Sequence, residues 1–178
     1  MFSLVSLVSF VVNQSDITGP RHRSAPSSGF APAGSDGSDG STQLGAYVRF
    51  RSSLPRHLNE MAIIMTARVW TAQYEWYVHK QAALQAGLNP AIVAAIAENK
   101  RPASMKPDEQ AIYEFTRELL DTKHVSDATF QNAIKAFGEK GVVDLVALTG
   151  YYGMVSALLN VDRYPLPAGA KPELGPLR

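Results

Sequence analysis

The sequence predicts an all-α protein, a bundle of about six helices. Apolar residues recur at helical spacing through most of the chain, and proline or glycine stands where periodic stretches begin or end. No stretch combines sustained β-type alternation with turn residues. Because 46% of the residues are hydrophobic and only 19% are charged, we also expect part of the surface to be buried between subunits, which predicts a homo-oligomer.

Composition divides the chain into three parts. Residues 1–43 are expected to be a flexible or atypical N-terminal extension, since Gly, Ser, Pro and Asp dominate residues 18–42. Residues 44–165 are expected to form the helical domain, and residues 166–178 a loose C-terminal tail. The apolar run Met1–Val12 has no positively charged start and is too short to span a membrane, so it reads as a strand or helix fragment. A weak export signal is the alternative to the cytoplasmic location that we expect.

The first periodic stretch is expected to begin as a helix at Pro55, because proline fits the first helical turn. Its core-facing stripe consists of Leu58, Met61, Ala62, Met65 and Val69. A second helix is expected from about Ala72 to Ala86, with Gly87 as the residue that ends it. The sequence leaves open whether these two helices are continuous or bent near Thr71.

The middle of the chain carries two further helix starts. Asn89 resembles an N-cap and is followed by Pro90, which predicts a short helix through about Glu98. Pro107 predicts the next start, because the two acids after it suit the positive N-terminal end of a helix.

Two helices are expected in the last third of the chain. Ser126 is the expected N-cap of a helix over residues 127–137, which Gly138 ends. The last helix covers about residues 141–161 and is apolar nearly all round, which predicts a central or interface helix rather than a membrane span.

Charge and residue usage exclude several classes of function. The chain has 17 basic and 16 acidic residues and no basic stripe, so nucleic acid is not an expected partner. It has no cysteine, which excludes disulfides, thiolate ligands and a cysteine nucleophile. Its four histidines have no metal-ligand spacing, and no glycine-rich phosphate loop is present. We therefore expect no metal, no cofactor and no membrane partner.

The residues that suit chemistry are concentrated in residues 59–80. Glu75 and His79 are one helical turn apart and share a face. Glu60 lies on the preceding helix and is expected to approach His79 if the two helices pack. A histidine in such surroundings gives or takes a proton near neutral pH. These three residues are the candidate catalytic groups.

Arg68, Tyr74 and Trp76 are the candidate substrate-binding residues. The guanidinium of Arg68 offers a fork of donors to a substrate carboxylate. Taken singly, each candidate also fits a structural role: His79 as a core histidine, the aromatic residues as core or interface residues, and Arg68 as a partner of Glu60 or of another subunit. The case for a site rests on their concentration in one short segment.

The segment resembles the carboxymuconolactone decarboxylase family, which includes the alkylhydroperoxidase D-like proteins. The resemblance covers about residues 54–160. It is carried by Glu60, the run Thr71–His79 (TAQYEWYVH), the turn Ala86-Gly87-Leu88 and the late Gly150-Tyr151-Tyr152. It implies an alkylhydroperoxidase D-like helical bundle and assembly into a trimer or hexamer. In the family a helix leads into the stretch seen here at Tyr47–Phe50, where this chain shows a disorder-prone sequence.

The resemblance also implies a chemistry. Thiol members carry Cys-x-x-Cys-x-x-x-His with an upstream glutamate; Glu60 and His79 match the relay, but Ala72 and Glu75 occupy the cysteine positions. A peroxidase is therefore disfavoured. The decarboxylase branch needs neither cysteine nor cofactor and acts on a small carboxylated lactone. His79 would then move the proton. Glu60 would orient or recharge His79, and Glu75 would be a second acid or base. A different carboxylic acid as substrate, or a non-catalytic helical oligomer, are the alternatives.

Overall fold

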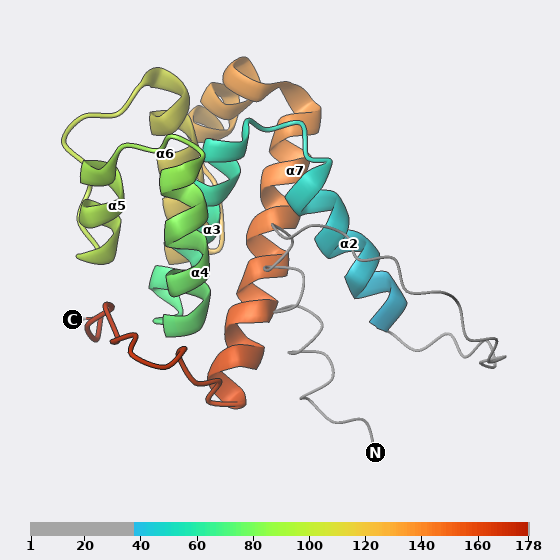
Figure 1. The fold of residues 1–178 in the computed structure, drawn as a ribbon. Helices are drawn as coiled ribbons and strands as arrows, with labels where there is room; N and C mark the ends of the chain where they lie inside the picture. The colour runs from blue at the N-terminus through green and yellow to red at the C-terminus, as the bar shows by residue number, and fades with distance from the viewer. Residues whose placement is uncertain (1–37, 178) are drawn as a thin grey trace, which may run out of the picture.

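A computed structural model of the chain describes residues 38–177, and in this part every regular element is a helix. Figure 1 shows their arrangement. The helices are α2 (Ser38–Phe50), α3 (Arg56–Val69), α4 (Gln73–Gln85), α5 (Pro90–Ala97), α6 (Pro107–Thr122) and α7 (Asp127–Val161). The predicted all-α class is confirmed for these residues.

The centre of the protein is α3, which packs against α4, α5, α6 and α7 (Figure 1). Every residue from Leu58 to Arg68 is buried, on all sides of the helix. The predicted stripe is therefore only part of the buried surface, and its last residue, Val69, is only partly buried. The sequence pattern could not show this, because polar residues such as Glu60 interrupt the apolar period on the other faces of α3.

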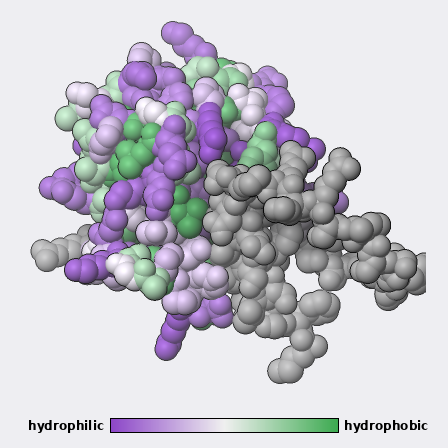
Figure 2. Space-filling view, viewed as in Figure 1, coloured by the Kyte–Doolittle hydropathy of each residue, from purple (hydrophilic) through white to green (hydrophobic). Residues whose placement is uncertain are grey.

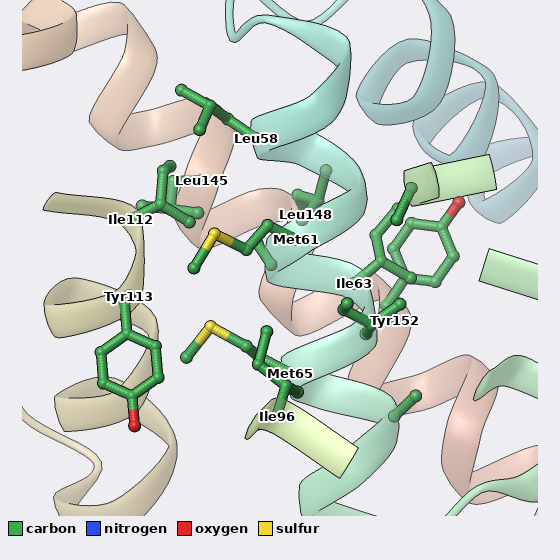
Figure 3. Packing of buried hydrophobic residues seen from close by; sticks show 14 of the residues in the cluster. Leu58, Met61, Ile63, Met65, Ile96, Ile112, Tyr113, Leu145, Leu148 and Tyr152 are labelled. Atoms are coloured by element: carbon green, nitrogen blue, oxygen red, sulfur yellow. The ribbon is translucent and has the colours of Figure 1, made fainter. Parts of the chain in front are cut away.

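Side chains from all six described helices contribute to the core. In Figure 3, Met61 and Met65 point from α3 toward α6, and Leu145 of α7 lies beside Ile112 of α6. Each fully buried side chain of this size stabilises the fold by about 1.5–3 kcal/mol relative to an exposed one. Figure 2 shows that the outer face in the same view is largely hydrophilic, with smaller hydrophobic groups between.

The helix starts and ends follow local chemistry. The side chain of Asn89 accepts a hydrogen bond from the Ala91 amide at 2.9 Å, and Ser126 caps α7 in the same way through Thr129. Gly87 has a φ of +92°, which glycine adopts without strain after the end of α4. These predicted caps are confirmed.

A sharp corner separates α3 from α4 and answers the question that the sequence left open. Thr71 adopts a φ of +48°, in the left-handed region that non-glycine residues rarely enter. The following residue, Ala72, is extended and fully buried. The chain therefore reverses here, and α4 returns alongside α3.

The two last predicted helices run together as α7, with a kink at Gly138, where φ is 70° and ψ is 173° (Figure 1). The second arm of α7, residues 139–161, is buried over most of its surface, and the exposed residues include Val143 (66%) and Val161 (71%). By length and composition α7 would qualify as a membrane span, and 56% of its apolar window lies buried inside the protein, as in a core helix. One such helix is weak evidence for a membrane.

Both ends of the domain differ from the expected boundaries. Helix α2 begins at Ser38, before the expected start at residue 44, and it includes the Tyr47–Phe50 stretch. A helix therefore leads into that stretch after all. It packs closely on α7, because a Cβ at Gly45 would lie 2.2 Å from the Tyr151 hydroxyl oxygen. The rest of the predicted extension, residues 1–37, lies outside the described residues.

The C-terminal tail is docked rather than loose. Figure 1 shows it running from the end of α7 past α4 toward α5. The amide of Gln73 donates a hydrogen bond to the Leu174 carbonyl at 2.7 Å, and its oxygen accepts from the Glu173 and Leu174 amides. Leu174 itself is buried in the core. The tail was predicted to be loose because it lacks a helical period, but backbone hydrogen bonds to a side chain need no period.

Candidate active site

Three side chains from neighbouring turns of α3 and α4 form a buried cluster, Glu60–His79–Glu75. Oε2 of Glu60 lies 2.7 Å from Nδ1 of His79. On the other side of the ring, Oε1 of Glu75 lies 3.1 Å from Nε2. The expected approach of Glu60 to His79 is confirmed, and the imidazole is held between two carboxylates.

The corner at Thr71 positions this cluster. Because the chain reverses there, His79 lies two turns along α4 from the corner and meets Glu60 on the antiparallel α3. Glu75 lies one turn nearer the corner, in the first turn of α4, where a carboxylate is favoured by the helix dipole. The i, i+4 spacing then places Glu75 beside the same ring.

Burial and charge act in opposite directions on His79. His79 is 2%, Glu75 3% and Glu60 4% exposed. Burial alone would lower the pKa of His79, but the charges of Glu60 and Glu75 and their hydrogen bonds outweigh it and raise the pKa from 6.5 to about 9. The imidazole is therefore protonated at neutral pH, and the cluster of two carboxylates and one imidazolium holds a proton in the core.

The two carboxylates are not equally satisfied. Glu60 has a short contact with Nδ1, whereas the contact of Glu75 with Nε2 does not have the direction of a good hydrogen bond. Oε1 of Glu75 is buried and forms no well-directed hydrogen bond among the described residues, although it lies 3.1 Å from Nε2. A buried carboxylate oxygen without a well-directed donor is costly, so this oxygen is the atom of the cluster that can still accept a hydrogen bond.

Two tyrosines of α7 border the cluster. The ring of Tyr152 meets that of His79 edge to face at a centroid distance of 4.9 Å, and Tyr151 meets Tyr152 in the same way at 5.3 Å. Burial, followed by the charge of Glu75, raises the pKa of both tyrosines, while Arg49 of α2 acts in the opposite direction. Tyr152 thus remains neutral and shields the imidazole. In the sequence these tyrosines stood out only through the resemblance to the family.

Arg68 lies away from the cluster. It is eight positions after Glu60 on α3, which separates the two Cα atoms by about 12 Å along the axis. Nη1 of Arg68 donates to the Thr71 hydroxyl at 3.4 Å, at the corner. Burial lowers the pKa of Arg68. The structure does not bring Arg68 to His79, so the expected shared site for a substrate carboxylate is not formed by these residues.

The two candidate aromatic residues have structural partners. Trp76 is fully buried, and its indole N–H donates to Oε2 of Glu173 in the tail at 3.1 Å. Tyr74 packs edge to face on Tyr164, which follows α7, at 4.7 Å. Neither ring forms an open platform for a substrate, and Trp76 anchors the tail. The tail lies far along the chain from Trp76, so spacing within residues 59–80 could not reveal this contact.

A second buried carboxylate, Asp144, organises the other end of the domain. It accepts hydrogen bonds from the Tyr47 hydroxyl, from the Ser53 amide and hydroxyl, and from Lys140, at 2.7–2.8 Å. Burial would raise the pKa of Asp144, but these donors outweigh it and hold the pKa well below its usual range. A single acid in an otherwise apolar helix was the sequence signal for this hub, which joins α2 and the α2–α3 loop to α7.

No group of three His, Cys, Asp or Glu side chains among the described residues is placed to hold a metal ion. In the Glu60–His79–Glu75 cluster the carboxylates lie on opposite sides of the ring, so their oxygens do not converge on one point. The arrangement suits the movement of a proton along a line.

The chain matches no protein-family model, no curated protein and no solved structure. Any assignment to a family therefore depends on the motif in the sequence and on the geometry of the cluster.

Proposed function

We propose that this protein is a cofactor-free carboxy-lyase related to carboxymuconolactone decarboxylase, with His79 as its proton-transfer group. The observation that supports the proposal is the buried contact of His79 with both Glu60 and Glu75. The proposed substrate class is a small carboxylated lactone or a similar acid whose carboxylate departs from a carbon conjugated to a carbonyl group. An electron sink within the substrate makes a cofactor unnecessary.

The proposed step keeps atoms and charge in balance. The bond between the carboxylate and the ring carbon breaks, carbon dioxide leaves, and the electron pair passes into the conjugated lactone as an enolate. A proton then adds to this enolate. His79 is protonated at neutral pH, and the proton passes from Nε2 to Oε1 of Glu75, 3.1 Å away, and from this carboxyl group to the enolate. Glu60 contacts Nδ1 and fixes the ring, and the neutral imidazole that remains takes up a new proton from solvent.

The test is release of carbon dioxide from carboxymuconolactone by the purified protein. We expect release by the wild type and a loss of at least about 100-fold in Glu75→Gln and His79→Gln, in line with the usual contribution of a general acid or base. His57→Gln is the matched control, because this histidine on α3 makes only a 3.9 Å contact with Asp108. Circular dichroism confirms that each variant is folded. Absence of release by the wild type would reject this substrate, and full activity in folded Glu75→Gln would reject the proposed path.

A non-catalytic role is the second candidate, and one observation favours it. All three side chains of the cluster are almost completely buried, so a substrate reaches Glu75 only after neighbouring side chains move. If the cluster is purely structural, His79→Gln lowers the stability and no small carboxylic acid is turned over. A peroxidase has no support, since the chain has no cysteine.

We propose self-association through the second arm of α7. Val143, Val146 and Met154 are exposed there, and they lie near one another along one side of the helix. Such a stripe is suited to pairing with a second copy. Sedimentation velocity of the wild type and of Val146→Asp tests this, and a trimer or hexamer that the variant dissociates is the expected result. A monomeric wild type would reject it.

A further inference from the structure

A groove of about 550 Å³ lies at the opposite end of α3 from Glu60. Its walls are the end of α5 with the residues after it and the docked C-terminal tail, and Arg68 of α3 contributes to its lining. The lining residues are Arg68, Ala97, Glu98, Asn99, Lys100, Glu173, Gly175, Pro176 and Leu177. The groove exists because the tail is held against α4 by Gln73 and Trp76.

Arg68 is a buried cation without a counter-ion. It is 4% exposed, and its Nε has no hydrogen-bond partner in the described part of the chain. Among the described residues its guanidinium forms one hydrogen bond, to the Thr71 hydroxyl at 3.4 Å, and no carboxylate pairs with it. An arginine stays charged at physiological pH, and a buried charge without a partner destabilises the folded protein. The protein keeps this charge at the wall of a groove that is open to a ligand.

The carboxylates around the groove already have partners of their own. Glu173 accepts from Lys80 and Trp76, and Glu98 pairs with Lys100 at 2.7 Å. Arg68 also lines a crevice of only about 10 Å³, which is too small for an organic molecule. An anion that neutralises Arg68 therefore has to come through the groove.

We propose that this groove binds a small organic acid, whose carboxylate pairs with Arg68 and whose apolar part lies against Ala97, Pro176 and Leu177. The guanidinium presents two parallel donors that match a carboxylate. Lys100 pairs with Glu98 in the same lining, so it keeps this carboxylate from repelling the anion. The groove is separate from the Glu60–His79–Glu75 cluster, because neither the groove nor the crevice behind Arg68 is lined by those residues.

Calorimetric titration of the wild type with benzoate, a carboxylate with an apolar ring, tests the proposal. We expect saturable binding at one site and a rise in Tm with ligand. Arg68→Met should weaken binding at least tenfold, Lys100→Met about threefold, and Arg56→Met not at all, since Arg56 is an exposed arginine at the other end of α3. Benzyl alcohol, which lacks the charge, should not bind. His79→Gln should bind benzoate normally, so this test does not depend on the proposed catalysis.

Stability separates a ligand site from a structural arginine. Without ligand, Arg68→Met removes an uncompensated buried charge, so its Tm should equal or exceed that of the wild type. A lower Tm, or unchanged benzoate affinity in Arg68→Met, would overturn the proposal. If Arg68→Met does not fold, unchanged affinity in the exposed variant Lys100→Met would overturn it instead. Tighter binding of inorganic phosphate than of benzoate would replace the organic acid by a phosphate ligand.

Discussion

Glu60 of α3 and His79 of α4 are 19 residues apart in the chain and meet at 2.7 Å in the core. This contact joins the two helices on either side of the corner at Thr71. It also gives His79 a protonation state that an isolated histidine lacks at neutral pH. The properties of the candidate site can therefore be tested through the titration of a single ring.

The first prediction concerns the pKa of His79, which is about 9 with both carboxylates in place. Glu60→Gln removes the larger of the two charge effects on His79 and the short contact with Nδ1. Glu75→Gln removes the smaller charge effect. Both variants should lower the pKa of His79, and Glu60→Gln should lower it more. The measurement is an NMR titration of the ring carbons of His79. Titration near 6.5 in the wild type would show that burial outweighs the carboxylates.

The raised pKa also predicts how stability changes with pH. The folded protein holds the proton of His79 up to about pH 9, whereas the unfolded chain loses it near pH 6.5. The stabilisation is therefore fully present below pH 6.5 and is lost as the pH rises through about 9. A shift of this size corresponds to about 3 kcal/mol. Urea unfolding between about pH 6 and pH 10 should show this fall in the wild type but not in His79→Gln. An equal fall of the free energy of unfolding with pH in the two proteins would contradict this prediction.

How far the sequence predicted these features depends on the range of the interactions. The caps at Asn89 and Ser126 were predictable, because each uses a side chain and an amide a few residues away. The Glu60–His79 contact was also predictable, because it needs only a sharp reversal between two adjacent helices. Glu173, the partner of Trp76, and Ser53, a partner of Asp144, lie more than 90 residues away in the chain, and helical periodicity carries no information about such contacts.

The third prediction tests the Asp144 hub. Asp144→Ala leaves the Ser53 amide and hydroxyl and the Tyr47 hydroxyl without their acceptor, so it should lower the free energy of unfolding by about 2–4 kcal/mol. Lys140→Met removes one exposed donor and keeps the other three, so its effect should stay below about 1 kcal/mol. Chemical denaturation of both variants measures this. Similar losses would show that the exposed lysine, and not the buried network, provides the stability.

The same hub has the opposite pH dependence to His79. The pKa of Asp144 is depressed in the folded protein, so its stabilisation is present above the unfolded pKa near 3.8 and is lost as the pH falls below it. At pH 6 the free energy of unfolding of the wild type should therefore exceed that of Asp144→Asn. The difference between the two proteins should shrink as the pH falls. Denaturant unfolding at pH 6 and at about pH 3 checks this. A gap that widens in acid would contradict the prediction.

The last prediction tests the close approach of α2 to α7, next to the tyrosines that border His79. A methyl group at Gly45 would lie 2.2 Å from the hydroxyl oxygen and 2.6 Å from Cζ of Tyr151, so the ring has to move. Gly45→Ala should therefore destabilise the protein by about 1–3 kcal/mol. Gly150→Ala is the matched control, because nothing lies within 4 Å of its Cβ position on helix α7, and alanine there should be stabilising by about 0.5–1 kcal/mol. The second substitution Tyr151→Ala should remove most of the cost of Gly45→Ala in a double-mutant cycle, since it removes the clashing ring. A stable Gly45→Ala, with no coupling to Tyr151, would mean that α2 does not rest on α7 in solution.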